Sequence, residues 1–179
     1  SLAYNVQKNF LLAYEAIIIL YLRGIYKIDE RFKNTVSLLK KIDSDNETLQ
    51  IAEALINLQN GKNKNAIDIF ENIIVQSSSG AHREYIYNNL ANAYERLYES
   101  KPLNDYLLLA EKNYRLSIEE NPNYYQASNN LSLLYLMKLS DLSKAQNAIS
   151  DCLAIFPEYH MGLNTQGLIF EEQRDFEKA

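Results

Sequence analysis

The chain has 179 residues, 47% of them hydrophobic and 23% charged, which is the composition of a folded protein with its own core. Its formal net charge of −5 and the lack of a cluster of Lys and Arg argue against nucleic-acid binding, which needs basic residues gathered on one face. Only 5 Gly and 3 Pro leave little room for the many turns of an all-β fold, so helices are favoured.

Three features bear on the compartment of the protein. The most apolar run, residues 16–22, is too short to span a bilayer and lies between Glu15 and Arg23, so no membrane partner is expected. No small-residue cleavage site follows Leu22, as a signal peptide would require. The single cysteine, Cys152, excludes an internal disulfide. These features favour the cytoplasm, with the periplasm as the alternative if a signal has been removed upstream.

The first 46 residues are predicted to form a pair of helices. Residues 2 to about 27 carry an apolar face at helical spacing, so wide that cover on more than one side is expected. The members of this face are Phe10, Ala13, Tyr14, Ile17, Ile18, Tyr21 and Leu22. A second helix is predicted to start at Asp29 and Glu30, with an apolar stripe made by Phe32, Val36, Leu39 and Ile42. Residues 1–46 are therefore expected to be a degenerate repeat or an N-terminal cap.

From residue 47 onward a pattern of two helices and a turn recurs. The predicted repeats are residues 47–83, 84–124 and 125–159, followed by an incomplete repeat at 160–179. In the second of these repeats, 16 positions lead from Tyr94 to Ala110, against 10 from Tyr135 to Ala145 in the third. The excess, near residues 99–104, is either an insertion in the turn or an extension of both helices.

The last repeat is predicted to begin its second helix at Asp175 and to stop there. A half repeat would leave the apolar face of its helix uncovered, because each repeat of such a stack covers its neighbour. The natural chain is therefore expected to continue past Ala179. An uncovered terminal helix would otherwise offer a contact for an oligomer.

Several residues recur in phase across these repeats. Pro122 and Pro157 close two of them, 35 residues apart. In the first helices, a small residue is followed three positions later by an aromatic residue: Leu90-Ala91 with Tyr94, Leu131-Ser132 with Tyr135, and Gly167 with Phe170. In the second helices, an alanine recurs at the same place, as Ala66, Ala110 and Ala145. In these residues the chain resembles the tetratricopeptide-repeat (TPR) family from about residue 47 to 179.

The resemblance implies an all-α fold, a right-handed α-solenoid of antiparallel helix pairs known as the TPR superhelix. Small residues at Ala91, Ser132 and Gly167 would let neighbouring helices approach closely. The first helix of each pair would line a concave groove that binds protein or peptide partners, so the implied function is a non-catalytic scaffold for protein–protein interaction. The alternative that stays open is a peptide-sensing domain of a bacterial regulator or phosphatase modulator.

The side of the first helices opposite the packing stripe is the predicted binding surface. It is rich in Asn, whose amide group both donates and accepts hydrogen bonds and so matches a peptide backbone. Tyr85 is expected in this groove, although most of the other tyrosines are expected in the core. The predicted peptide-binding or partner-binding residues are Tyr85, Asn88, Asn89, Asn92, Gln126, Asn129, Asn130, Leu133, Met137, Asn164 and Leu168.

Leu133, Leu136 and Met137 form an apolar patch on the predicted surface. It would take an apolar side chain or a helix of the ligand, or else be covered by the helices that follow. TPR domains that hold a chaperone's terminal carboxylate do so with Lys and Arg on this face. The corresponding places here are Asn88, Asn92, Asn130, Met161 and Thr165, so a carboxylate tail is not the expected ligand.

Catalysis has little support in the sequence. His82 and His160 lack partners at the spacing of metal ligands, and Cys152 occupies a small-residue packing place, where a buried and inert thiol is expected. Glycine-rich phosphate loops are absent. We therefore expect no catalytic residue, no metal site and no cofactor.

Overall fold

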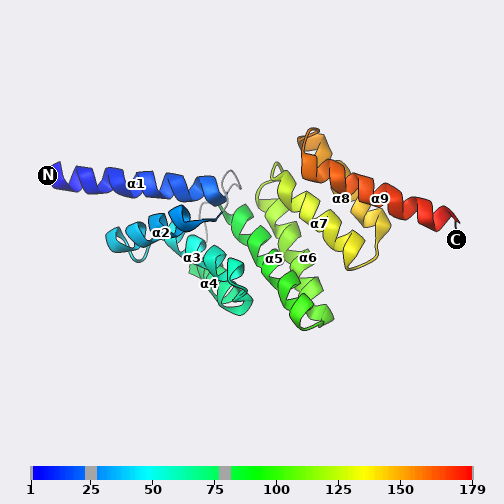
Figure 1. The fold of residues 1–179 in the computed structure, drawn as a ribbon, viewed down its shortest axis with the longest axis horizontal. Helices are drawn as coiled ribbons and strands as arrows, with labels where there is room; N and C mark the ends of the chain where they lie inside the picture. The colour runs from blue at the N-terminus through cyan, green and yellow to red at the C-terminus, as the bar shows by residue number, and fades with distance from the viewer. Residues whose placement is uncertain (1, 23–27, 77–81, 179) are drawn as a thin grey trace. The chain divides into compact units, whose positions relative to one another are not determined.

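The computed structural model describes residues 2–22, 28–76 and 82–178, and the regular structure within these ranges is α-helical (Figure 1). The helices are α1 (Leu2–Leu22), α2 (Glu30–Ile42), α3 (Glu47–Gln59), α4 (Asn63–Gln76), α5 (Arg83–Ser100), α6 (Asn104–Glu120), α7 (Tyr125–Met137), α8 (Leu142–Ile155) and α9 (His160–Lys178). They belong to two compact units, Ser1–Gly80 with α1 to α4 and Ala81–Ala179 with α5 to α9. None of these helices is both long enough and apolar enough to cross a membrane.

The core of the first unit has the pattern that the sequence predicts. Its buried side chains include Phe32, Val36 and Leu39 of α2, Ile51, Ala54, Leu55 and Leu58 of α3, and Ala66, Phe70 and Ile73 of α4. Asp29 caps α2, because its Oδ1 accepts hydrogen bonds from the backbone N–H groups of Arg31 and Phe32. Gly61, with a φ of 74°, makes the left-handed turn between α3 and α4.

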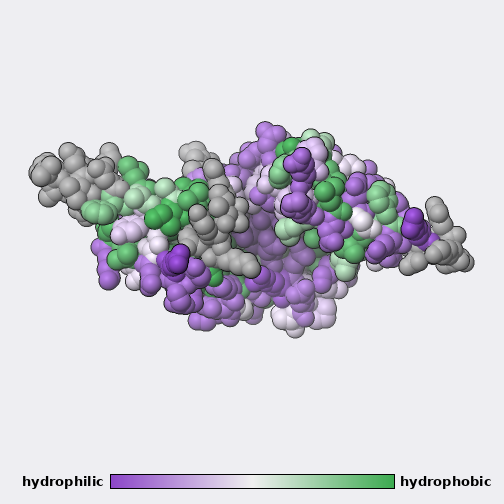
Figure 2. All heavy atoms as spheres, turned by 45° about the horizontal axis from the view of Figure 1, so that its top comes forward, coloured by the Kyte–Doolittle hydropathy of each residue, from purple (hydrophilic) through white to green (hydrophobic). Residues whose placement is uncertain are grey.

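The wide apolar face of α1 is less covered than predicted. Ile18 is fully buried, whereas Phe10 is 55% exposed and Leu12, Ile17 and Leu20 are also exposed. Figure 2 shows hydrophobic atoms along this helix. α1 packs mainly on α2 and, to a smaller extent, on α3, but these contacts leave Phe10, Ala13 and Ile17 of the predicted face exposed, so the expectation of wide cover is wrong for these side chains. Residues 23–27, at the end of the predicted helix, lie outside the described residues.

The second unit consists of two helix pairs and one further helix. α5 packs on α6, α7 packs on α8, and α9 packs on both α7 and α8. The connections within the pairs are short, so paired helices run antiparallel (Figure 1). The stripes that the sequence predicts are buried: Leu90, Ala91 and Tyr94 of α5, Ala110, Tyr114 and Ser117 of α6, Leu131, Ser132 and Tyr135 of α7, and Ala145, Ile149 and Cys152 of α8.

The longer second repeat is explained by longer helices. α5 has 18 residues and α6 has 17, against 13 in α7 and 14 in α8. α5 continues through Ser100, where the sequence allows a turn insertion, and α6 begins already at Asn104. The extra residues therefore lengthen both helices, which is the second of the two alternatives.

Polar side chains tie the helices of this unit together. Ser132 Oγ donates to the backbone carbonyl of Ala145 at 2.8 Å, which needs the close approach of α7 and α8 that a small residue permits. Tyr135 Oη accepts from Arg115 Nη2 at 2.7 Å and donates to Glu111 Oε1 at 2.6 Å, joining α7 to α6. Burial and the neighbouring Glu111 raise the pKa of Tyr135 to about 12, so this phenol remains a donor at neutral pH.

Two expectations for α9 are wrong. The predicted start of a new helix at Asp175 is not a helix start, because α9 runs without a break from His160 to Lys178 and no Gly or Pro follows Gly167 to end it. Gly167 is also not a packing place: a Cβ atom added there would meet nothing within 4 Å. Leu163 and Phe170, the large residues of the same predicted stripe, are 46% and 49% exposed.

Candidate binding surface on α5, α7 and α9

The predicted binding residues lie on the first helices of the second unit, α5, α7 and α9. Hydrogen bonds between side chains connect these helices in sequence order. Asn130 Nδ2 of α7 donates to Asn88 Oδ1 of α5 at 2.9 Å. Thr165 Oγ1 of α9 donates to Asn129 Oδ1 of α7 at 2.9 Å. We call these two bonds the amide ladder. The asparagines predicted to hold a ligand thus also hold the helices to one another.

Burial differs among the amides of this surface. Asn88 is 6% exposed and Asn129 is fully buried, whereas Asn130 is half-buried and Asn164 is exposed. The sequence predicts all four in the groove as readers of a peptide backbone. Asn88 and Asn129 are instead enclosed between helices, and the side-chain oxygen of each accepts a hydrogen bond of the amide ladder. Asn164 makes no hydrogen bond within the described chain, so both ends of its amide face solvent.

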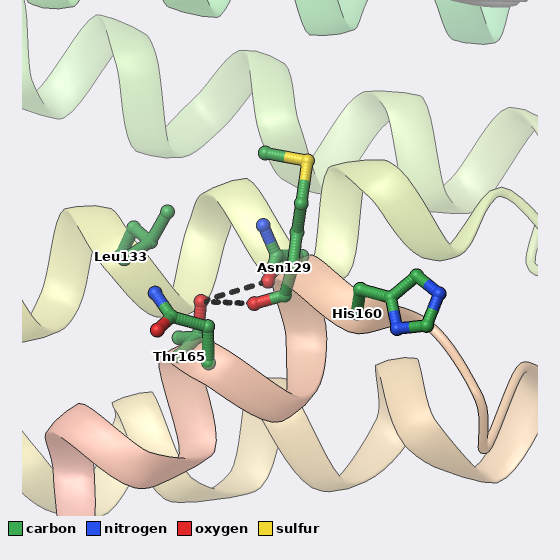
Figure 3. Close-up of a pocket in the computed structure, with 6 residues that line it drawn as sticks. Asn129, Leu133, His160 and Thr165 are labelled. Carbon is green, nitrogen blue, oxygen red and sulfur yellow. Dashed lines mark hydrogen bonds between the residues drawn. The ribbon is translucent and has the colours of Figure 1, made fainter.

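Asn129 has one polar atom without a partner. Its Nδ2 is buried and makes no hydrogen bond in the described part of the chain. A buried donor left unpaired costs about 1–3 kcal/mol, so such atoms are rare in folded proteins and call for an explanation. Figure 3 shows this nitrogen on the side of the Asn129 amide that faces away from Thr165.

Asn129 and Thr165 lie at the bottom of a pocket between α7 and α9 (Figure 3). The pocket has a volume of about 260 Å³, and its lining is completed by Leu133, His160, Met161 and Asn164. Its walls are mostly apolar, and His160 is the titratable residue among those that line it. Three predicted residues, Asn129, Leu133 and Asn164, are thus brought together in one cavity.

A second polar cluster lies between α5 and α6. The Tyr114 hydroxyl is within hydrogen-bonding reach of Glu95 Oε1 and lies 2.8 Å from Asn92 Oδ1. One hydroxyl proton serves only one of these two acceptors at a time. Burial raises the pKa of the Glu95 carboxyl, and a protonated Glu95 would donate to Tyr114 and leave the phenol proton for Asn92. Asn92 Nδ2 makes no hydrogen bond within the described residues, so it remains free for a ligand.

Tyr85 is not a groove residue, and this prediction is wrong. Its side chain is 8% exposed and packs with Tyr124 and Ala127, with the two tyrosine ring centres 4.7 Å apart. Tyr124 precedes α7 directly, so the start of the next helix pair covers the position where the sequence suggests access. The expectation that most tyrosines lie in the core is confirmed for Tyr87, Tyr94 and Tyr114.

The remaining predicted residues differ in what they offer. Asn89 Nδ2 donates to the backbone carbonyl of Tyr85 at 2.8 Å, so one end of its amide is used within its own helix. Gln126 is half-buried, and its Oε1 is buried without a partner in the described chain. Met137 is 64% exposed and Leu168 is also exposed, so following helices do not cover the apolar residues at this edge. Leu133 is half-buried in the pocket wall.

Sequence reasoning misses the roles of three residues. It predicts Tyr114 only as a packing residue, His160 only as a helix start, and Thr165 only as a place where a basic residue is missing. No signal in the sequence pairs Thr165 with Asn129 or Tyr114 with Glu95, since these pairs lie 36 and 19 residues apart. Cys152 is buried as predicted, and burial raises the pKa of its thiol to about 11. The described residues contain no cluster of side chains suited to a metal ion.

Antiparallel helix pairs stacked in chain order define a helical-hairpin repeat protein. More particularly, the chain has the TPR fold, because similar solved structures are TPR proteins. A thermophilic TPR protein from Thermus thermophilus is 19% identical with a TM-score of 0.69, over 94% of this chain and 84% of that one. A TPR protein from Parabacteroides merdae is 15% identical with a TM-score of 0.62, over 92% and 62%.

A further similar structure contains a bound peptide. It is the first TPR domain of Spaghetti (RPAP3) bound to the HSP90 peptide SRMEEVD, 20% identical with a TM-score of 0.61, over 74% of this chain and 98% of that one. Neither a protein-family model nor a curated protein sequence matches the chain. At these identities the similarity establishes the fold.

Proposed function

We propose that this protein is a non-catalytic interaction module that binds a segment of a partner protein, an extended peptide or a helix, across α5, α7 and α9. The observation that carries the proposal is that one set of helices has both unused hydrogen-bonding groups and exposed apolar side chains. Three amide groups of this surface have no partner within the described chain: Asn92 Nδ2, Asn130 Oδ1 and the whole Asn164 amide. Two apolar side chains that follow them in the sequence are exposed, Met137 and Leu168. Amides of this kind pair with the alternating N–H and C=O groups of a peptide.

The chemistry of this surface favours a ligand that is neutral where it is bound. No Lys or Arg lines the pocket between α7 and α9, so an acidic tail would lose its hydration there without gaining the permanent cation of a Lys or Arg side chain. The RPAP3 domain supports peptide binding by this fold. The peptide bound to the RPAP3 domain does not identify the ligand of this chain, because the basic residues expected of a carboxylate-binding domain are missing here.

A catalytic function is not part of the proposal. The Cys152 thiol is buried and its pKa is raised, so it stays in the unreactive protonated form at neutral pH. The peptide-sensing alternative stays a prediction, since no contact in the described residues favours it over a scaffold.

The test is a selection of peptides from a displayed random library against the whole 179-residue chain, followed by affinity measurement on two variants. Asn164→Ala should weaken the selected peptides about fivefold to tenfold, because one hydrogen bond contributes about 1 kcal/mol. Asn147→Ala, on α8, is the matched control: Asn147 is also exposed and makes no hydrogen bond within the described chain. It should leave the affinity unchanged.

The control has its own diagnostic value, because Asn147 lines a different pocket with Leu142, Gln146 and Gln173. If Asn147→Ala weakened the peptides and Asn164→Ala did not, the binding surface would lie between α8 and α9 and the proposal would be wrong. Failure to select any peptide that binds the folded chain would also count against it.

A further inference from the structure

We propose that the pocket between α7 and α9 is a subsite for one glutamine side chain of the bound partner, recognised through its carboxamide by Asn129 and Asn164. This inference rests on the proposed function and adds to it the identity of a residue in the ligand. It is carried by a fully buried side chain with an unpaired polar atom that points into a cavity of limited size (Figure 3).

The first step concerns the donor at the bottom of the pocket. Asn129 is 0% exposed, and its Nδ2 has no hydrogen-bond partner in the described chain. Its other end, Oδ1, accepts from the Thr165 hydroxyl at 2.9 Å, and turning the amide over would leave Oδ1 unpaired in place of Nδ2. A carbonyl oxygen brought into the pocket by a ligand would pair with Nδ2 and remove the penalty of about 1–3 kcal/mol for an unpaired buried donor.

The second step concerns the Thr165 hydroxyl, which has one proton and two acceptors within reach. These are Asn129 Oδ1 at 2.9 Å and the backbone carbonyl of Met161 at 3.0 Å. When the hydroxyl donates to Met161, the Asn129 amide is able to turn over and donate to Thr165, and it then presents an acceptor to the pocket. A carboxamide carries both a carbonyl oxygen and an NH₂ group, so it matches the Asn129 amide in either orientation. A ketone or an ester only accepts hydrogen bonds, and a hydroxyl group donates and accepts at one atom and not at two.

The third step concerns size and walls. A volume of about 260 Å³ is below the roughly 300–1,000 Å³ typical of pockets for small-molecule ligands, so it suits a single side chain. Leu133 and Met161 supply apolar surface for a short methylene stem, and the flexible thioether of Met161 adapts to its shape. Glutamine has such a stem, two methylene groups long, which carries the carboxamide from the pocket entrance toward Asn129.

The fourth step concerns charge and the second amide. Asn164 lines the pocket and is exposed, with no hydrogen bond inside the described chain, so it is available to the outer edge of the same carboxamide. The pocket contains neither a Lys or Arg for a glutamate nor a carboxylate for a lysine. A site built around hydrogen bonds rejects side chains that lack the matching groups more strongly than a purely apolar site rejects a change in size.

The experiment is an NMR titration of the ¹⁵N-labelled 179-residue chain with three capped amino acids, N-acetyl methylamides of glutamine, glutamate and methionine. The side-chain NH₂ signals of Asn129 and Asn164 are assigned by their loss in Asn129→Asp and Asn164→Asp. We expect the glutamine probe to shift both NH₂ pairs and to bind at least about tenfold more tightly than the other two. Equal shifts from all three probes, or no shift of the Asn129 NH₂ pair by glutamine, would overturn the assignment.

A second measurement protects the test against loss of folding in the Asn129 variant. Asn164→Ala removes an exposed amide that makes no hydrogen bond in the described chain, and it should weaken the glutamine probe without changing the unfolding midpoint. Peptides selected against the chain should carry Gln at one fixed position, and Gln→Glu there should cost at least about tenfold in affinity. Peptides that bind α5, α7 and α9 without this preference would refute the glutamine subsite but leave the proposed function standing. If the glutamine probe shifts the NH₂ signals but no peptide can be selected, the subsite would stand and the proposed function would be refuted.

Discussion

Replacing Tyr114 by Phe should destabilise the second unit by an amount that depends on pH. The Tyr114 side chain is fully buried, and its hydroxyl serves Glu95 and Asn92 on the neighbouring helix. Tyr114→Phe keeps the ring and removes only the hydroxyl, so the two acceptors lose their shared donor. Because a hydrogen bond to a charged group contributes about 1.5–3 kcal/mol, we expect the free energy of unfolding to fall by about 2 kcal/mol at neutral pH.

The pH dependence follows from the carboxyl group of Glu95. Burial raises its pKa, and the hydrogen bond from Tyr114 lowers it, so Tyr114→Phe should raise the pKa of Glu95 in the folded state further. A carboxyl group whose pKa is higher in the folded state favours folding below its unfolded pKa, and this contribution is lost as the pH rises through the folded pKa. The effect of Tyr114→Phe should therefore shrink to about 1 kcal/mol below pH 4.5, the ordinary pKa of the group, where only a neutral hydrogen bond is lost.

The assay is urea unfolding followed by circular dichroism at a series of pH values, for the wild-type chain, Tyr114→Phe, Glu95→Gln and the double variant. Glutamine does not titrate, so in the Glu95→Gln background the effect of Tyr114→Phe should no longer change with pH. The reasoning would be refuted by a Tyr114→Phe effect that is the same at low and neutral pH, or by one that keeps its full pH dependence in the Glu95→Gln background.

Three further predictions concern packing and reactivity. Gly162→Ala should lower the free energy of unfolding by about 1–3 kcal/mol, since the new Cβ would lie 3.0 Å from Leu153 Cδ2. Gly167→Ala should raise the free energy of unfolding by up to about 1 kcal/mol, because its new Cβ would meet nothing within 4 Å and Ala favours a helix. Thermal and urea unfolding measure both variants, and a change of the same sign in the two would contradict the packing. Ser132→Ala should cost about 1 kcal/mol in the same assay because it removes the bond to α8, and an unchanged midpoint would count against that bond. Native Cys152 should react with iodoacetamide far more slowly than in urea at neutral pH, as mass spectrometry would show, and equal rates would mean that the thiol is accessible.

Much of the fold is predictable because the packing of helical repeats follows from residues that recur in the sequence. The small residues Ala91 and Ser132, with Tyr94 and Tyr135 three positions later, predict which faces of α5 and α7 are buried, and the structure confirms it. The length of the second repeat is less predictable. A turn insertion and two longer helices give the same spacing in the sequence. No Gly or Pro lies between Tyr94 and Lys101, so the sequence does not exclude a longer first helix.

The binding surface is less predictable than the fold, for a physical reason. An amide at helical spacing faces the groove whether or not the next helix reaches over to it, so in the sequence Asn88 and Asn129 look as accessible as Asn164. Only the tertiary structure shows which helix covers which residue. Tyr85 illustrates the same limit, because the ring of Tyr124 packs against it and nothing in either local sequence indicates that contact.

The amide ladder links binding to stability in a way that separates two classes of asparagine. In a stack of repeats each helix pair is stabilised mainly by its neighbours, so the Asn130 bond to Asn88 and the Thr165 bond to Asn129 act at the joints between repeats. Asn130→Ala should therefore lower both peptide affinity and unfolding free energy, because one side chain serves both. Asn164→Ala should lower affinity alone, since the Asn164 side chain makes no hydrogen bond to another described residue. Equal losses of stability in the two variants would mean that the ladder does not connect the first helices.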